Sequence, residues 1–368
     1  MLLVQTERNA LLATLSATVG VVERRHTLPI LSNLLLEKKA GVLTLLATDL
    51  ELQVSTRLDN AGRGDDFAIT VAARKLFDIV RALPEDAKVK MDSKDSQIVV
   101  SAGKSRFTLQ TLPAADFPRM ETSAGVGDEI SLPQKTLKRL LQLVQFAMAS
   151  QDIRYYLNGM LLVLGGKTLR VVATDGHRLS YAETMLDKEA TAREVIIPRK
   201  TVQELVKLLG DVEDPVSLRI GLNQVTIRLP DTELVTKVVD GKFPDYQRVI
   251  PQNQPRQMKA NRQTVMQALQ RASILSNEKF RGVRLVMSEG TLGIVCNNNE
   301  QEEAQEEIEV QFAGDPLDVG FNVTYLLDGL GALGAEEIML SLADANSSML
   351  LTSEAEAGFK YVVMPMRI

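Results

Sequence analysis

Alternating apolar and polar residues predict a β-strand that begins at Gly166 and places Leu169, Val171 and Ala173 on one face. A tight polar turn, Thr174-Asp175-Gly176, follows the strand, because Asp and Gly are residues that favour turns. This strand and turn are the clearest local signal in the chain.

The same pattern occurs twice more. A strand that starts at Gly41 ends at Thr48-Asp49, and a weaker copy that starts at Gly290 ends at Asn297-Asn298. The glycines are about 125 residues apart, which is far longer than a solenoid period of about 20–50 residues. The repeat therefore indicates similar domains.

Apolar residues at helical spacing predict two helices in each of the three units. Thr6 and Asn261 are expected N-caps, and Ser131-Leu132-Pro133-Gln134 is expected to form a capping box. The predicted helices cover residues 6–22, 73–83, 131–149, 199–209, 261–275 and 325–333.

Each unit reads as helix, strands, helix, strands, and its two similar halves suggest an inner duplication. Helices on one face of antiparallel sheets belong to the α+β class. We therefore predict three similar domains, each built from duplicated helix-plus-antiparallel-sheet modules, at residues 1–126, 127–255 and 256–368.

The composition narrows the class of protein. With 368 residues, 45% of them hydrophobic, the chain can form two or three cores. Its single cysteine excludes a disulfide framework and a cysteine-based zinc site. No segment resembles a signal peptide or a membrane span, so we expect a cytoplasmic protein with no membrane partner.

Positive charge is concentrated on the predicted helices although the net charge is -5. Arg74-Lys75 and Arg199-Lys200 open two helices at matching repeat positions, where each cation opposes the helix dipole by about 0.3–1 kcal/mol. A polyanion held against these helices would offset that cost. The alternative is an ordinary solvated helix face.

A phosphate backbone is the expected polyanion, because no helix carries a cluster of base-reading residues. Binding should then be independent of sequence and strongly dependent on salt. Aromatic residues make up only 4% of the chain and tryptophan is absent, which favours duplex DNA over stacked single strands.

Candidate catalytic residues are sparse. Asp49 and Asp175 could be metal ligands, but they occupy equivalent turns, and turn propensity explains both. His177 lies beside Asp175 without a nucleophile at triad spacing, which is a weak indication of hydrolysis. Cys296 lies in an apolar strand and is expected in the core.

Apolar residues also gather in turns and termini of the second and third units. Methionine and proline without long charged side chains suit a groove that accepts varied apolar peptides, whereas simple packing between two domains is the alternative. The residues concerned are Leu157, Leu179, Pro244, Val249, Val363, Met364, Pro365 and Met366.

Several longer motifs, spread over all three units, resemble one known family, the bacterial DNA polymerase III sliding clamp or β subunit. They are TLPIL at 27–31, ARK at 73–75, LPAADFP at 112–118, RYYLNGM at 154–160, ATDGHRL at 173–179, VDGKFPDY at 239–246, ILSNEKFRGVR at 274–284 and YVVMPMR at 361–367.

The resemblance implies a non-catalytic processivity factor without metal or cofactor. It implies a head-to-tail homodimer closed into a ring, with helices lining the hole around duplex DNA and sheets outside. Clamp loader, replicative and translesion polymerases, and mismatch-repair and ligase proteins would dock short apolar motifs in a groove between the second and third domains.

The resemblance also assigns residues. DNA contacts would fall on Arg25, Arg74, Gln151, Tyr155 and Tyr156, with Arg199 and Lys200 nearby. The peptide groove would comprise Leu157, Thr174, Gly176, His177, Arg178, Leu179, Pro244, Arg248, Val249, Phe280, Asn322, Tyr325, Ser348, Val362, Val363, Met364, Pro365, Met366 and Arg367.

The chain departs from the family pattern at a few positions. Asn346 stands where the family often has an apolar residue, so one groove wall is expected to be more polar, and Ile368 replaces a common Leu. Two other functions remain open at this point: an enzyme that acts on nucleic acid through Asp49, Asp175 and His177, and a scaffold that uses only the groove.

Overall fold

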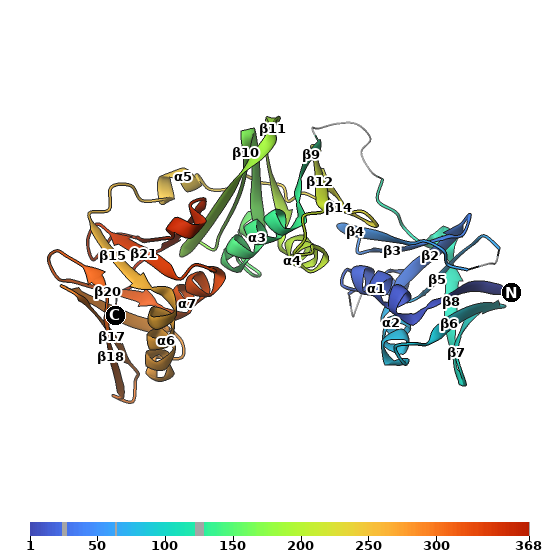
Figure 1. Ribbon diagram of the computed structural model, residues 1–368, viewed down its shortest axis with the longest axis horizontal. Coiled ribbons are helices and arrows are strands. Elements are labelled where there is room, and N and C mark those ends of the chain that lie inside the picture. The colour runs from blue at the N-terminus through green and yellow to red at the C-terminus, as the bar shows by residue number, and fades with distance from the viewer. Residues whose placement is uncertain (24–27, 63–64, 122–128, 368) are drawn as a thin grey trace. The chain divides into compact units, whose positions relative to one another are not determined.

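The computed structural model describes residues 1–23, 28–62, 65–121 and 129–367 and shows an α+β fold of helices on antiparallel sheets (Figure 1). The chain divides into two compact units. Unit 1 comprises Met1–Lys135 and Gln203–Val238, and unit 2 comprises Thr136–Val202 and Val239–Ile368.

Unit 1 contains a 12-stranded antiparallel sheet in the order β1-β6-β7-β8-β5-β2-β3-β4-β14-β13-β12-β9. The strands are β1 (Leu2–Glu7), β2 (Asn33–Lys39), β3 (Val42–Thr48), β4 (Leu52–Leu58), β5 (Phe67–Ala72), β6 (Lys88–Lys94), β7 (Gln97–Ala102), β8 (Ser105–Pro113), β9 (Glu129–Pro133), β12 (Pro215–Ile220), β13 (Gln224–Arg228) and β14 (Thr232–Lys237).

Two helices, α1 (Arg8–Val19) and α2 (Ala73–Ala82), pack against each other on one face of this sheet (Figure 1). The alternation predicted for the Gly41 strand explains the contact, because Leu43, Leu45 and Ala47 are fully buried. Strand β4 pairs with β14, with Thr56 opposite Thr232, so this sheet runs from the predicted first domain into the second.

Unit 2 contains a seven-stranded sheet, β10-β11-β23-β22-β21-β15-β19, and a four-stranded sheet, β18-β17-β16-β20. The strands are β10 (Gly159–Thr174), β11 (Arg178–Pro198), β15 (Arg256–Asn261), β16 (Gly282–Ser288), β17 (Thr291–Asn297), β18 (Glu303–Glu309), β19 (Gln311–Phe312), β20 (Leu317–Asn322), β21 (Glu337–Leu342), β22 (Met349–Thr352) and β23 (Phe359–Val363).

Helices α6 (Arg262–Ala272) and α7 (Val323–Ala332) pack against each other and against strands of unit 2. Strand β11 pairs with β23, which joins a hairpin of the predicted second domain to the third. The remaining helices are α3 (Gln134–Val144), α4 (Arg199–Leu208), α5 (Tyr246–Val249), η1 (Pro29–Ser32), η2 (Ala114–Asp116), η3 (Gln145–Ala147), η4 (Tyr155–Leu157), η5 (Ser273–Leu275) and η6 (Glu354–Glu356).

The repeated strand-and-turn pattern is confirmed in all three copies. Gly41, Gly166 and Gly290 each have a positive φ, of 84°, 56° and 73°, which favours glycine at the hairpin entry. At the other end, a side-chain oxygen of Asp49, Asp175 or Asn298 accepts hydrogen bonds from backbone N–H groups two to four residues later. These three side chains therefore build turns.

Two predicted caps are wrong. Thr6 lies in β1 opposite Val89, so its backbone already belongs to the sheet, and α1 starts at Arg8 without a side-chain cap. Ser131 lies in β9, and Gln134 Oε1 accepts from the backbone N–H of Gly210, which excludes the capping box. The Asn261 cap is confirmed, because its side chain accepts from Thr264 N.

The second helix of each predicted unit is confirmed within about two residues, a normal uncertainty for helix ends. The first helix ends at Val19 instead of 22, and α3 ends at Val144 before a short 3-10 turn. The boundary predicted between residues 126 and 127 falls outside the described residues, and both predicted domain boundaries stay a prediction.

Candidate functional site

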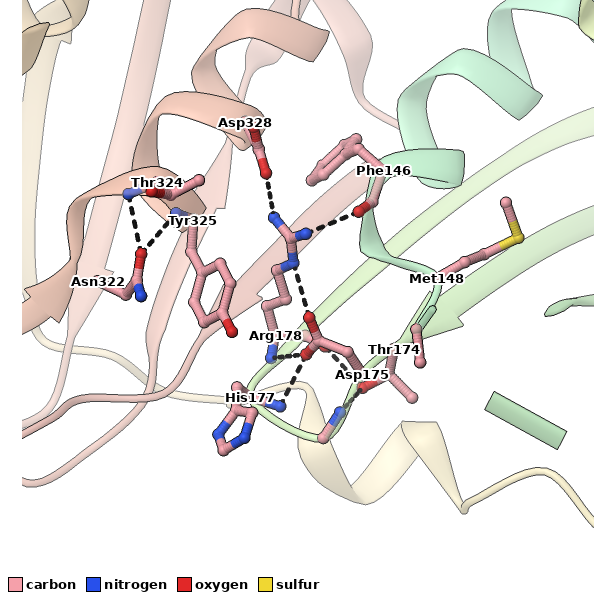
Figure 2. Close-up of polar contacts among 12 residues, drawn as sticks. Phe146, Met148, Thr174, Asp175, His177, Arg178, Asn322, Thr324, Tyr325 and Asp328 are labelled. Atoms are coloured by element: carbon pink, nitrogen blue, oxygen red, sulfur yellow. Dashed lines mark hydrogen bonds and ion pairs between the residues drawn. The ribbon is translucent and has the colours of Figure 1, made fainter. Parts of the chain in front are cut away.

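The turn between β10 and β11 forms the rigid centre of the site (Figure 2). Thr174 Oγ1 donates to the carbonyl oxygen of Arg178 at 2.6 Å and accepts from Gly176 N at 3.1 Å. Asp175 Oδ1 accepts from the backbone N–H groups of His177 and Arg178 at 2.9 and 3.1 Å. Gly176 has a φ of 92°, so the turn needs a residue without a Cβ.

The guanidinium of Arg178 hydrogen-bonds to three groups of the fold. Nε donates to Asp175 Oδ2 at 3.0 Å, Nη1 to Asp328 Oδ2 at 2.5 Å and Nη2 to the Phe146 carbonyl at 2.7 Å. Its side chain is 10% exposed. Burial lowers the pKa of Arg178, but Tyr361 and Asp328 outweigh this and raise it, so the side chain is cationic.

The C-terminal segment closes one side of the site. Val363 pairs with Arg178, and then Met364 N donates to the His177 carbonyl at 2.9 Å. Two residues later, Met366 N donates to the carbonyl of Gly320 in β20, again at 2.9 Å. The tail therefore runs from the turn to the four-stranded sheet.

The start of α7 closes another side. Asn322 Oδ1 accepts from Thr324 N and Tyr325 N at 2.9 and 3.3 Å, an N-cap that fixes the first helical turn (Figure 2). The Tyr325 ring stacks on His177 at 6.4 Å between centroids with 20° between the planes. Asn322 also donates to the carbonyl oxygen of Phe280, whose ring is exposed.

Apolar residues from distant segments form the floor. Leu157, Leu179 and Val362 belong to one buried cluster with Phe243 and Tyr246. Tyr156, Val249 and Leu350 pack against that cluster while partly buried. The cluster thus provides a fixed base. Seven further residues assigned to the groove are exposed or half-buried: His177, Pro244, Arg248, Phe280, Met364, Pro365 and Met366.

Other residues assigned to the groove lie around this surface. Arg248 pairs with Asp245 at 2.9 Å, and the Ser348 carbonyl accepts from Gln254 Nε2 at 3.0 Å. Asn346 is exposed, and its backbone N–H donates to Asp344 Oδ1 at 2.8 Å. The structure thus brings the turn, tail, α5, β22 and start of α7 together in unit 2.

Sequence reasoning missed Asp328 and Phe146, the two groups that hold Arg178 from α7 and η3. Asp328 is the lone charged residue of α7, and a lone acid in an otherwise uncharged helix is a usable signal because a largely buried cation such as Arg178 needs a partner. The contribution of Phe146 is a backbone carbonyl, which no side-chain pattern can reveal.

The arginines that open α2 and α4 have partners that the helix-dipole argument did not anticipate. Arg74 Nη2 donates to the Val22 carbonyl at 2.8 Å, just after α1. Arg199 Nη1 donates to the carbonyls of Met148 and Ala149 at 2.6 and 3.3 Å, just after η3. Each guanidinium is therefore already bound to backbone carbonyl oxygens outside its own helix.

Three predicted DNA contacts lie in η4 and in the loop before it. Gln151 is exposed with a φ of 58°, Tyr155 is 57% exposed, and Tyr156 is half-buried with its ring 6.0 Å from that of Tyr155. Hydrogen bonds from Arg154 lower the pKa of Asp152 to about 2, and this ion pair fixes the loop. Arg25 lies outside the described residues.

Other helix cations are already paired with carboxylates. Lys135 pairs with Glu213, Arg139 with Glu356, and Arg271 with Glu306. Lys75 is exposed, and Lys200 is half-buried and has a partner. Fewer helix cations are therefore available to contact a polyanion than the charge pattern suggested.

Within the described ranges, no group of three His, Cys, Asp or Glu side chains could hold a metal ion. Cys296 is buried as predicted, and burial raises the pKa of its thiol to about 11. No helix in the part of the chain that the structure describes is long and apolar enough to cross a membrane.

Family models of the DNA polymerase III β subunit match nearly the whole chain. The N-terminal domain matches residues 2–121, the central domain residues 131–245 and the C-terminal domain residues 247–367. The chain belongs to this family. Its function is therefore that of a sliding clamp, a non-catalytic processivity factor of the polymerase, which sets aside the enzyme hypothesis.

Individual relatives agree with the family match. The β sliding clamp of Pseudomonas putida is 47% identical over 363 residues, which cover 98% of this chain and 99% of the relative. That of Escherichia coli K12 is 46% identical over 362 residues, with the same coverage.

Solved clamp structures share the fold. A Pseudomonas aeruginosa sliding clamp bound to griselimycin has a TM-score of 0.95 and 45% identity, with all of both chains covered. A Caulobacter crescentus clamp has a TM-score of 0.94 and 37% identity, covering 100% of this chain and 99% of the other.

Proposed function

We propose that two copies of the chain close head to tail into a ring around duplex DNA. The ring slides because it contacts phosphates without reading bases. Clamp loader, replicative and translesion polymerases, and mismatch-repair and ligase proteins dock on it through short apolar motifs. The residues that carry this function are those assigned above to the DNA surface and the groove.

The observation that carries the ring is a repeated junction with one missing copy. Strand β4 pairs with β14, and β11 pairs with β23. In both pairs, the strand after an Asp turn meets the last strand of the following repeat. The strand after the third turn is β18, and the last strand of the first repeat is β8.

Among the residues that the structure describes, both strands have free edges. Strand β18 is the outer strand of the four-stranded sheet. Strand β8 pairs with β7 through Ser105–Gln110, whereas β5 meets it at residues 111–113, so its other edge is open along most of its length in the described chain. Unpaired edges are templates for another strand. One chain thus carries both halves of a junction that a second copy would complete.

Side chains at the two edges are complementary. Strand β18 presents Glu303, Glu307 and Glu309 on its exposed positions, and β8 presents Arg106. Phe107 of β8 is 36% exposed, and Ile274, in the η5 turn that contacts β18, is 77% exposed. An interface with an apolar centre and opposite charges at its rim would bury these side chains.

The register of this junction follows from the repeat. Thr48 pairs with Gln53, Thr174 with Leu179, and Asn297 with Glu303, which makes Gln53, Leu179 and Glu303 equivalent. Across the two observed junctions, Gln53 pairs with Val235 and Leu179 pairs with Val362.

The last strands of the first two repeats are aligned by their hairpins. Gln224 pairs with Lys237, and Gln97 pairs with Gln110. Val235 lies two residues before Lys237 and Thr108 lies two residues before Gln110, so Thr108 of β8 is equivalent to Val235. Glu303 should therefore lie opposite Thr108 of the second copy.

The groove proposal rests on unit 2. The turn at residues 174–178, the tail and the start of α7 surround a preformed apolar floor, which is the usual form of a peptide-binding site. A 45% identical clamp is described as bound to griselimycin. We propose that griselimycin and partner peptides occupy this groove.

The ring is tested by topology. The chain is loaded by its clamp loader onto nicked circular DNA, and protein that co-elutes with the DNA is measured before and after one restriction cut. Retention on the circle with loss after linearisation is the expected result. Equal dissociation from both forms contradicts encirclement.

A further inference from the structure

Asp328 stands out because it is the lone charge on α7 and belongs to none of the predicted contact sets. Its Oδ2 atom accepts from Arg178 Nη1 at 2.5 Å, across the junction between the helix and the turn at residues 174–178. The Asp328 side chain is 36% exposed, whereas that of Arg178 is 10% exposed. The pair is therefore partly shielded from solvent, where an ion pair is stronger than on an open surface.

Arg178 connects the turn to the helix. Figure 2 shows its guanidinium extending toward Asp328 and Phe146, while the His177 ring lies on the other side of the turn. All three nitrogens of the guanidinium donate to groups of the fold. Arg178 therefore influences a docked peptide through the turn that it holds.

Tyr325 lies one helical turn before Asp328. Its ring is 4.5 Å from the Arg178 guanidinium carbon and is stacked on the His177 ring. Its carbonyl accepts from the buried Tyr361 hydroxyl at 2.9 Å. We call the two stacked rings the His177–Tyr325 wall. The position of α7 relative to Arg178 therefore determines the position of this wall.

The other end of α7 has its own anchor. Arg139 Nη1 donates to the Ala332 carbonyl at 2.8 Å, and Arg139 also pairs with Glu356. Glu356 in turn accepts from Gly334 N at 3.0 Å. Loss of the Asp328 carboxylate would therefore leave the helix attached at its C-terminal end and at its Asn322 cap, and would remove its ion pair with the turn at residues 174–178.

We propose that Asp328 is a positioning residue for peptide docking: through Arg178 it fixes the His177–Tyr325 wall of the groove. The inference rests on the proposed peptide groove and adds a residue that does not touch the occupant. The affinity for the docked peptide then depends on the Arg178–Asp328 ion pair, which joins the turn to α7.

The test compares griselimycin binding to the full-length dimer by calorimetry. Asp328→Asn keeps the shape of the side chain and removes its charge, and the dissociation constant should rise about tenfold, within the range of couplings carried through packed networks. Asp328→Glu restores the charge and should bind within about threefold of wild type. Asp78→Asn, which breaks the exposed Arg81–Asp78 pair on α2, is the matched control and should change nothing.

A second background separates positioning from general destabilisation. If Asp328 acts through the wall, Asp328→Asn should add no further loss in a Tyr325→Ala chain, and the dimer mass should not change. Wild-type affinity in Asp328→Asn, or full additivity with Tyr325→Ala, overturns the inference. If Asp328→Asn does not fold, the same comparison is made with Asp328→Ala, which also removes the carboxylate, and full additivity there also overturns the inference. Failure of the wild-type chain to bind griselimycin contradicts the groove itself.

Discussion

The backbone N–H of Met364 donates to the carbonyl oxygen of His177 at 2.9 Å. This bond continues the β11–β23 ladder one step past Val363, into the C-terminal tail. The end of the chain and the turn of an internal hairpin thereby form one continuous edge. The turn is held by its own hydrogen bonds, whereas the tail is held here by its bond to the turn, so the apolar surface at this edge includes both segments.

Removal of residues 364–368 should abolish peptide docking and leave the dimer intact. Griselimycin or a partner peptide should bind wild type near 1 µM, about -8 kcal/mol, and should show no measurable binding to the truncated chain. Calorimetry gives the affinity and light scattering gives the mass. Removal of Ile368 alone keeps Arg367 and the Met364 and Met366 bonds and is the control, with near wild-type affinity. Wild-type binding by the shorter chain would refute the assignment of the groove.

Lys75 and Arg74 should differ in their effects. Lys75→Ala should reduce the salt dependence of DNA retention by about one unit of slope without a change in stability, as expected for one phosphate contact. Arg74→Ala should also cost about 1 kcal/mol of folding stability, because its bond to the Val22 carbonyl is lost. Retention over a salt series and thermal unfolding measure the two effects. An Arg74→Ala chain of unchanged stability would mean that this bond contributes nothing in solution.

Cys296 should resist alkylation in the native protein. Burial raises the pKa of its thiol to about 11, so the reactive thiolate is scarce at pH 8 and increases only as the pH approaches that value. Mass spectrometry after iodoacetamide at pH 8 should find the native chain unmodified and the guanidinium-unfolded chain fully modified. Rapid modification of the folded chain would place Cys296 outside the core.

Paired cysteines test the register of the proposed ring junction. In a Thr108→Cys, Glu303→Cys chain, mild oxidation should yield covalent dimers, because opposite residues in paired strands have Cβ atoms about 4.5–5.5 Å apart. In the control, Thr108→Cys with Gln305→Cys, the second cysteine is displaced by two residues on the same strand face and should crosslink far less. More efficient crosslinking of the control would show that the repeat-derived register is wrong.

The sequence predicted the repeated elements well because their determinants are local. Alternation of apolar residues located β3, β17 and the second half of β10, which begins at Gly159 and not at Gly166 as predicted. Asn261 was identified as a cap from its own side chain. Thr6 and Ser131 were assigned to helix starts wrongly, because long-range pairing with Val89 and Ser217 places them in strands. The residues next to Thr6 and Ser131 in the sequence do not reveal such long-range pairing.

The candidate site was predictable only in part. The family resemblance identified His177, Tyr325 and Met364, which the structure brings together: the Tyr325 ring stacks on His177, and Met364 N donates to the His177 carbonyl. The role of Arg178 was not evident, because its partners include a backbone carbonyl and an aspartate on a distant helix. Arg74 and Arg199 were expected to bind a polyanion, yet both already donate to carbonyl oxygens outside their own helices.

The most direct test of the ring crosslinks the proposed junction and then measures whether the protein stays on circular DNA. The Thr108→Cys, Glu303→Cys chain is loaded onto nicked circular DNA by the clamp loader, oxidised, and washed in high salt to remove electrostatic contacts. The proposed function predicts that the oxidised protein stays on the circle and is released by a single restriction cut. Release from the intact circle after efficient crosslinking would contradict a closed ring around DNA.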